Sequence, residues 1–251
     1  LFEFARTAYA STAPRSCGGA WLFNTPLSRR QLSDPSNRQI TAINNDCLVT
    51  NARIDLSGGP VVVEIPDIEG RYFSAAFMDA FTDNFFFVGT RPTAGRGGRF
   101  ALVPPGWSRA SVPAGAQPVL SPTLDVWMLV RILIDGPEDA AAVHALQDRI
   151  YIEPPKGWQG GAILSVEPGD VTDARNFLVV VRDMHSRCDA ADPRVARASE
   201  HADFQSKRPD EIAMRWTGAI AEGLARLRLA PLDGRDADGW SYSLASTGAF
   251  G

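Results

Sequence analysis

Short apolar runs fill the first half of the chain, and longer runs with helical spacing fill the second half. Between residues 40 and 134 the apolar runs are separated by turn-forming segments such as Ser57-Gly58-Gly59-Pro60. Many short strands divided by Gly/Pro turns are typical of an antiparallel sandwich or barrel. We therefore predict strands at residues 40–44, 48–55, 60–65, 72–78, 85–90, 99–103, 117–120 and 124–134.

The pattern changes at residue 135. Pro137-Glu138-Asp139 predicts the start of a helix, because proline fits the first helical position and acidic residues suit the first turn. Further along, Ile212, Trp216 and Ile220 belong to one apolar helical stripe. We predict helices at residues 2–10, 137–150, 173–185, 193–203 and 209–229, and a short strand at 241–244.

Strands followed by helices, rather than alternating with them, indicate an α+β fold. We expect an antiparallel, β-sandwich-like domain over residues 1–135. A helical extension with a short C-terminal turn or strand follows over residues 136–251, and we expect it to pack on the β domain. A chain of 251 residues is long enough to fold around its own core without a metal or disulfide.

Composition and charge argue against a nucleic-acid partner and against a membrane span. The chain carries 25 Lys+Arg against 29 Asp+Glu, a formal net charge of −4, and has no dense basic block. We therefore expect no nucleic-acid partner, because phosphate neutralisation requires clustered positive charge. No apolar run approaches the roughly 20 residues that span a bilayer, so we expect no membrane span.

Common catalytic and metal-binding motifs do not occur in the sequence. It contains no GxSxG, SxxK, GxxxxGK[ST] or GxGxxG segment. Its three histidines fall on separate predicted helices without metal-ligand spacing, so we expect no metal and no cofactor. The three cysteines lie far apart with no CxxC pair, which favours free thiols over a bridge.

Alternation within two predicted strands points to a polar cluster. The odd positions of 71–79 place Arg71 and Asp79 on either side of an aromatic face. The odd positions of 127–133 place Arg131 among apolar residues. Because a buried charge must be paired or reach solvent, we expect Arg71, Asp79 and Arg131 to share one cluster. That cluster is either an active site or an ion pair that closes a sheet edge.

Two polar segments add candidate ligand-binding residues. Asn44-Asn45-Asp46 lies between two predicted strands, where its side chains either form a turn or bind ligand hydroxyls or a metal. Residues 79–85 combine Asp and Asn with Phe, and Gly89-Thr90-Arg91 follows them. Aromatic rings beside amides and carboxylates suit a small or sugar-like ligand, and they suit a sandwich rim without a ligand equally well.

These segments together resemble the bacterial domain of unknown function 1254. The resemblance covers residues 40–155, continues more weakly from Asn176, and rests on Asn44–Leu48, Ile54–Pro60, Gly70–Tyr72, Asp79–Phe85, Gly89–Arg91, Pro105–Trp107, Val126-Trp127 and His144–Asp148. It implies a sandwich-like domain followed by helices, often in exported bacterial proteins. The resemblance therefore implies a periplasmic or exported location; without it, we would expect a cytoplasmic one. Relatives usually continue into a second β domain, of unknown function 1214, which would begin near Gly251.

Three positions depart from the pattern of that family. Cys47 and Val49 stand where Thr and Tyr are typical, and Arg53 stands where Trp is frequent. A site that uses Thr and Tyr in relatives would therefore be altered in this chain.

Two hypotheses of function follow. The first is an enzyme, a hydrolase or lyase acting on a small or sugar-like substrate, in which a carboxylate is the general base and an arginine holds an anionic group. The second is a non-catalytic binding or assembly module that pairs with a second β domain or another copy of the chain.

The candidate catalytic residues are Asp46, Asp79 and Arg71, and the candidate substrate-binding residues are Asn44, Asn45, Tyr72, Asn84, Arg91 and Arg131. Convergence of Arg71, Asp79 and Arg91 in one pocket would support the enzyme, whereas salt bridges on a flat rim would contradict it.

Overall fold

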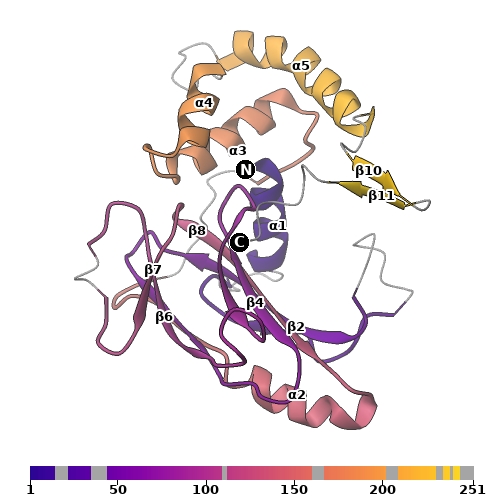
Figure 1. The fold of residues 1–251 in the computed structure, drawn as a ribbon. Coiled ribbons are helices and arrows are strands. Elements are labelled where there is room, and N and C mark those ends of the chain that lie inside the picture. Colours follow the sequence, from indigo (N-terminus) through magenta and orange to yellow (C-terminus); the bar gives the residue numbers. More distant parts are fainter. Residues whose placement is uncertain are drawn as a thin grey trace.

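Two β-sheets packed face to face form the body of the molecule (Figure 1). The computed structural model describes residues 1–14, 22–34, 44–108, 112–159, 167–201, 209–229, 234–237 and 240–243. The five-stranded sheet is antiparallel throughout, in the order β1 (Leu27–Ser28), β2 (Cys47–Asp55), β8 (Asp125–Leu133), β4 (Phe73–Met78) and β5 (Asn84–Gly89). The four-stranded sheet has the order β7 (Gln117–Leu120), β6 (Gly98–Val103), β3 (Val61–Ile65) and β9 (Tyr151–Glu153), with β6 and β7 parallel.

The core lies between the two sheets and follows from alternation along the strands. On β8 the even-numbered residues 126–132 are buried in the core, and the odd-numbered residues 127–133 are half-buried on the outer face. Phe73 and Phe77 of β4 enter the same core from the five-stranded sheet, and Val63 and Leu102 enter it from the four-stranded sheet. Burial of this apolar surface is the main favourable term in folding the sandwich.

The helices lie at two ends of the sandwich, and most of them cover one end of the outer face of the five-stranded sheet. They are α1 (Phe2–Thr12), α2 (Ala140–Gln147) after a 3-10 turn at Pro137–Asp139, α3 (Ala174–Ser186), α4 (Pro193–His201) and α5 (Pro209–Leu229). In Figure 1, α3, α4 and α5 lie together at one end of the sandwich, α1 lies beside α3, and α2 lies at the opposite end. Phe177 of α3 stacks on Phe2 of α1 at 5.3 Å and on Trp216 of α5 at 6.1 Å between ring centroids. We call α1, α3, α4 and α5 the helical layer.

A buried ion cluster joins the end of α3 to the five-stranded sheet. Asp55 and Asp125 lie directly opposite each other on β2 and β8, and like charges in that position destabilise a sheet. Arg187 compensates both: its Nε and Nη2 donate to Asp125 at 2.7 and 2.9 Å, and Nη2 donates to Asp55 at 2.9 Å. The Asp125 side chain is only 1% exposed, so the arginine neutralises a charge that water does not reach.

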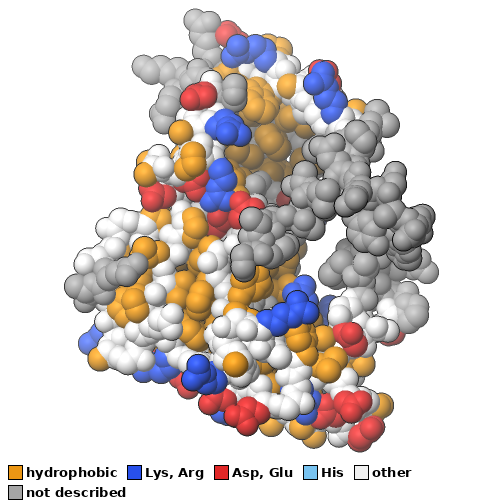
Figure 2. Space-filling model, in the orientation of Figure 1, with side chains coloured by type: hydrophobic (Ala, Val, Ile, Leu, Met, Phe, Trp, Pro, Cys, Tyr) orange, Lys and Arg blue, Asp and Glu red, His pale blue; other side chains and the backbone are white. Residues whose placement is uncertain are grey.

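A second arginine joins α4 to the turn between β4 and β5. Arg194 donates to the buried Asp79 at 2.7 Å and to Asp83 at 2.5 Å, and its guanidinium lies 4.1 Å from the centroid of the Phe81 ring. Asp192, next to the start of α4, also accepts from Arg194 at 2.6 Å. Figure 2 shows charged side chains gathered between α4 and the sandwich and around α2, with hydrophobic side chains between these two zones.

Arg53 is buried where α1 crosses the sheet. Its guanidinium lies 4.1 Å from the centroid of Trp127 and 4.8 Å from that of Phe4, and Nη2 donates to Thr7 at 2.8 Å. Among the described residues, Nε and Nη1 have no hydrogen-bond partner, and burial lowers the pKa of Arg53 to about 9. Cation–π contact with the two rings therefore compensates part of the desolvation of this charge.

The α+β fold, with sandwich strands first and helices afterwards, is confirmed. The strands predicted from residue 48 to 134 form within one residue of their predicted bounds, whereas β1, β9 and β10 (Gly234–Ala237) were not predicted. β10 pairs with β11 (Trp240–Ser243). Most of the strand predicted at 40–44 and the end of the helix predicted to residue 203 lie outside the described residues.

The predicted domain boundary at residue 135 stays a prediction. Two elements pack against the part of the chain on the other side of this boundary. β9 lies after the boundary but pairs with β3 of the sandwich, while α1 lies before it but packs on α3. No helix among the described residues is long and apolar enough to cross a membrane.

Removal of the Arg187 side chain tests the link between the helical layer and the sheet. Arg187→Met leaves Asp55 and Asp125 buried, opposite each other and without this cation. We expect the free energy of unfolding to fall by about 3–5 kcal/mol in urea denaturation, as when one partner of a buried ion pair is removed.

Two further variants control this prediction. Arg6→Met breaks the Arg6–Glu3 pair, whose side chains are 51% and 61% exposed, and should change stability by less than ~1 kcal/mol. Adding Asp125→Asn to Arg187→Met should restore part of the loss, because it removes one of the opposed charges. Equal losses in Arg187→Met and Arg6→Met would contradict the role of the cluster.

Candidate functional site

Within the described part of the chain, helices cover one end of the outer face of the five-stranded sheet and leave its other end open. The strand register sets Met78 opposite Trp127, and Ser74 opposite Arg131. Trp127 packs against the apolar cluster that α1 and α3 form. Toward Arg131, the described residues leave a groove with a cavity volume of about 720 Å³.

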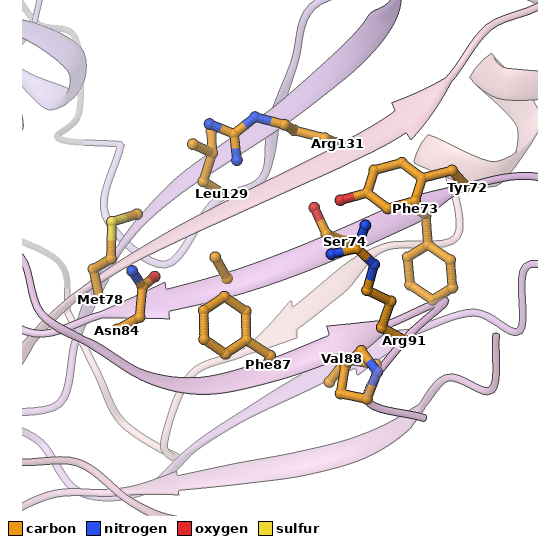
Figure 3. A pocket seen from close by; sticks show the side chains of 12 residues that line it. Tyr72, Phe73, Ser74, Met78, Asn84, Phe87, Val88, Arg91, Leu129 and Arg131 are labelled. Carbon is orange, nitrogen blue, oxygen red and sulfur yellow. The ribbon is translucent and has the colours of Figure 1, made fainter. Parts of the chain in front are cut away.

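The groove has an apolar floor and polar groups around it (Figure 3). Its described lining is Tyr72, Phe73, Ser74, Ala76, Met78, Asn84, Phe87, Val88, Arg91, Pro92, Leu129 and Arg131. Ala76, Phe87 and Leu129, from three neighbouring strands, make the middle of the floor. In Figure 3, Arg91 and Tyr72 point toward Ser74 at one end, and Met78 and Asn84 lie at the other end.

The turn after β5 places Arg91 over the groove. Thr90 fixes this turn to β4, because its backbone N–H donates to the Phe73 carbonyl at 3.0 Å and its hydroxyl accepts from the Phe73 N–H at 2.9 Å. Gly89 permits this close approach, since a Cβ at that position would lie 2.5 Å from the Phe73 carbonyl oxygen. Arg91 thus follows a segment that the sheet itself holds in place.

The groove carries positive charge that no described carboxylate pairs. Within the described part of the chain, neither Arg91 nor Arg131 forms a salt bridge, and the lining contains no Asp, Glu or His. Arg131 is half-buried on the sheet, while Arg91 is exposed at the rim. Two guanidinium groups above an apolar floor form a site suited to anions.

A separate hollow of about 690 Å³ lies around Arg71 and Asp139. Arg71 donates to both carboxylate oxygens of Asp139, at 2.5 and 2.8 Å, and to the Leu133 carbonyl at 3.1 Å. The Arg71 hydrogen bonds lower the pKa of Asp139 to about 2. This bidentate pair occupies the polar groups of both residues, so Arg71 has a structural partner outside the groove.

The two predicted catalytic carboxylates, Asp79 and Asp46, likewise lie outside the groove. Asp79 is held by Arg194, and burial raises the pKa of Asp79 against the opposing effect of that arginine. Asp46 is exposed at the start of β2, where its carboxylate accepts from the Cys47 thiol at 3.1 Å. Burial and this carboxylate raise the pKa of Cys47 to about 12, so the thiol is protonated at neutral pH.

The Asn44 side chain shapes the turn before β2. Its Oδ1 accepts from the backbone N–H groups of Asp46 at 3.1 Å and Cys47 at 2.9 Å, while Asn45 is exposed. Cys47 and Cys188 are free thiols, and Cys17 lies outside the described residues. Across the described chain, no three His, Cys, Asp or Glu side chains gather as a metal site.

Comparison with known proteins gives the family of the chain. A family model described as a protein of unknown function (DUF1254) matches residues 23–154. The chain belongs to this family. The matched span contains every strand of both sandwich sheets and all of the groove lining, and it ends before the helices α3, α4 and α5 of this DUF1254 chain.

Two solved structures are similar to this DUF1254 chain. The VPA0106 protein from Vibrio parahaemolyticus has a TM-score of 0.58 at 22% identity, over 78% of this chain and 52% of that one, so the two share a fold. A putative uncharacterized protein from Burkholderia cenocepacia has a TM-score of 0.36 at 18% identity, over 66% of this chain and 42% of that one. The chain thus spans about half the length of the Vibrio protein, and no curated protein matches it.

The groove brings together four of the predicted site residues. They are Tyr72, Asn84, Arg91 and Arg131. Asp46, Arg71, Asp79, Asn44 and Asn45 do not line it. The predicted cluster of Arg71, Asp79 and Arg131 does not form, because Arg71 and Asp79 flank opposite ends of β4 and pair with Asp139 and Arg194 instead.

Sequence reasoning missed the residues on the open face of β4. The odd positions of β4 enter the core, and it is the even ones, Ser74 and Ala76, that share a face with Arg131 and Leu129. Alternation separates the two faces of a strand, but it does not show which faces of neighbouring strands lie on the same side of the sheet. The cross-strand register supplies that information.

Titration of Asp139 tests the Arg71–Asp139 pair. We expect its carboxyl carbon in NMR to titrate with a midpoint near 2, and expect Arg71→Gln to raise the pKa toward the ordinary value of about 3.9. Since the folded-state pKa is lowered, the pair stabilises the fold fully above about pH 4, and this stabilisation is lost as the pH falls through about 2. A midpoint near 3.9 in the unaltered chain would contradict the pair.

Proposed function

We propose that the groove binds a small organic anion through Arg91 and Arg131, and that the chain works as a ligand-binding module. The observation that carries this proposal is the pair of guanidinium groups above an apolar floor, with no described carboxylate between them. Arginine binds carboxylate or phosphate groups through charge-assisted hydrogen bonds, which are stronger than neutral ones.

Three other arginines, at the ends of the five-stranded sheet, support this view by contrast. Arg71 holds Asp139, Arg187 holds Asp55 and Asp125, and Arg194 holds Asp79. The chain thus matches these three charges with its own carboxylates, whereas no described carboxylate matches the charges in the groove. The apolar floor lowers the local dielectric, which strengthens attraction to such an anion.

The residues that line the groove support ligand binding better than they support catalysis. A hydrolase or lyase needs an activated nucleophile or a positioned base. Asp46 and Asp79 lie outside the groove, and its described lining offers Ser74 and Tyr72 without a histidine, carboxylate or lysine to activate them. Of the two functions expected from the sequence, ligand binding is therefore the better supported. Pairing with a second β domain or a second copy stays a prediction.

Calorimetric titration with adipate tests the proposed function. The chain should bind adipate, and it should bind the uncharged diamide adipamide at least ~10-fold more weakly, because charge-assisted hydrogen bonds are lost. The double variant Arg91→Gln/Arg131→Gln should lose at least ~10-fold in adipate affinity for the same reason.

Arg99→Gln is the matched control for this titration. Arg99 lies on β6 of the four-stranded sheet beside Glu64 and Glu153, away from the groove, so its loss removes one positive charge without touching the site. We expect unchanged adipate affinity in this variant. Absence of adipate binding, or equal affinity in the double variant, would overturn the proposed function.

A further inference from the structure

The two arginines enter the groove from opposite sides. Arg131 belongs to β8, Arg91 follows β5, and β4 lies between these strands. Gly89, Ser74 and Arg131 form one row across the three strands. Two strand spacings separate the ends of that row, about 10 Å.

Their side chains also lie over different parts of the floor. In Figure 3, the Arg91 guanidinium is turned toward Ser74, whereas the Arg131 side chain runs along β8 toward Leu129. The two guanidinium groups therefore do not converge on one point. A ligand with a single carboxylate meets one arginine in this arrangement and leaves the other charge without a partner.

The surface between the two charges is apolar. Ala76 is 7% exposed, and the half-buried Leu129 lies beside it across the β4–β8 pair. A hydrocarbon segment gains free energy by covering such a surface, whereas a charged or strongly hydrated segment would lose its water there. Like charges on both sides repel each other, and two anionic groups relieve this repulsion better than one.

We propose that the ligand is an organic dianion, a dicarboxylate whose short hydrocarbon spacer crosses β4. One carboxylate binds Arg91 near Tyr72 and Ser74, the other binds Arg131, and the spacer lies on Ala76 and Leu129. This assignment rests on the proposed function, since it specifies which class of anion the same groove takes.

Adipate and its monomethyl ester separate this proposal from simple anion binding. The two molecules have the same carbon spacer between their carbonyl groups and differ in one charge. In calorimetric titration of the unaltered chain, we expect adipate to bind about 10-fold more tightly than monomethyl adipate, because the ester gives up one charge-assisted contact.

Single variants then show whether each arginine takes its own carboxylate. In Arg91→Gln and in Arg131→Gln, the preference for adipate over its ester should fall to less than about twofold, since only one cation remains. Arg99→Gln should keep the full preference, which also shows that loss of one positive charge elsewhere has no such effect.

Each outcome bears on one claim. Equal binding of adipate and its ester, weakened by the double variant, overturns the dianion assignment and leaves anion binding in place. A preference for adipate that persists in either single variant also overturns the assignment. If neither molecule binds, the proposed function itself falls.

Discussion

Two buried carboxylates that face each other, Asp55 and Asp125, set the constraint on which the arrangement depends. They lie opposite on neighbouring central strands, where their repulsion would weaken the sheet. Arg187 bonds to both from the end of α3, 62 residues beyond Asp125 in the chain. The sandwich therefore needs the helical layer for its electrostatic balance, and the stacking of Phe177 on Phe2 holds α1 against the same layer. Charge and apolar packing together decide which end of the outer face is covered.

The same strand that anchors the helical layer also carries the groove. β8 runs from Asp125, beneath the helices, to Arg131 on the open part of the sheet. At the covered end, carboxylates on the sheet meet an arginine from a helix. At the open end, arginines meet no carboxylate among the described residues. At the covered end, the Arg187 cation balances two carboxylates. At the open end, a bound dianion would balance two arginines.

Much of the fold follows from local sequence, and much of the site does not. Alternation predicts β8 and the face that carries Arg131, and proline with acidic residues predicts the start near Pro137. Strand order is not local: β8 lies between β2 and β4, although more than 40 residues separate it from either. The partner of Asp79 lies 115 residues further along the chain, at Arg194. Residue type and spacing therefore suggest Arg91 and Arg131 as candidates, but they cannot show that Asp79 is paired elsewhere.

A crystal structure of the chain with adipate would show whether the groove holds a dianion between its two arginines. We predict one adipate in the groove, with one carboxylate within hydrogen-bond distance of Arg91, the other within that distance of Arg131, and the carbon spacer across Ala76 of β4. Adipate bound through one carboxylate to a single arginine, with its other end in solvent, would contradict the dianion assignment. Adipate found only outside the groove would contradict the account of the open face as a binding site.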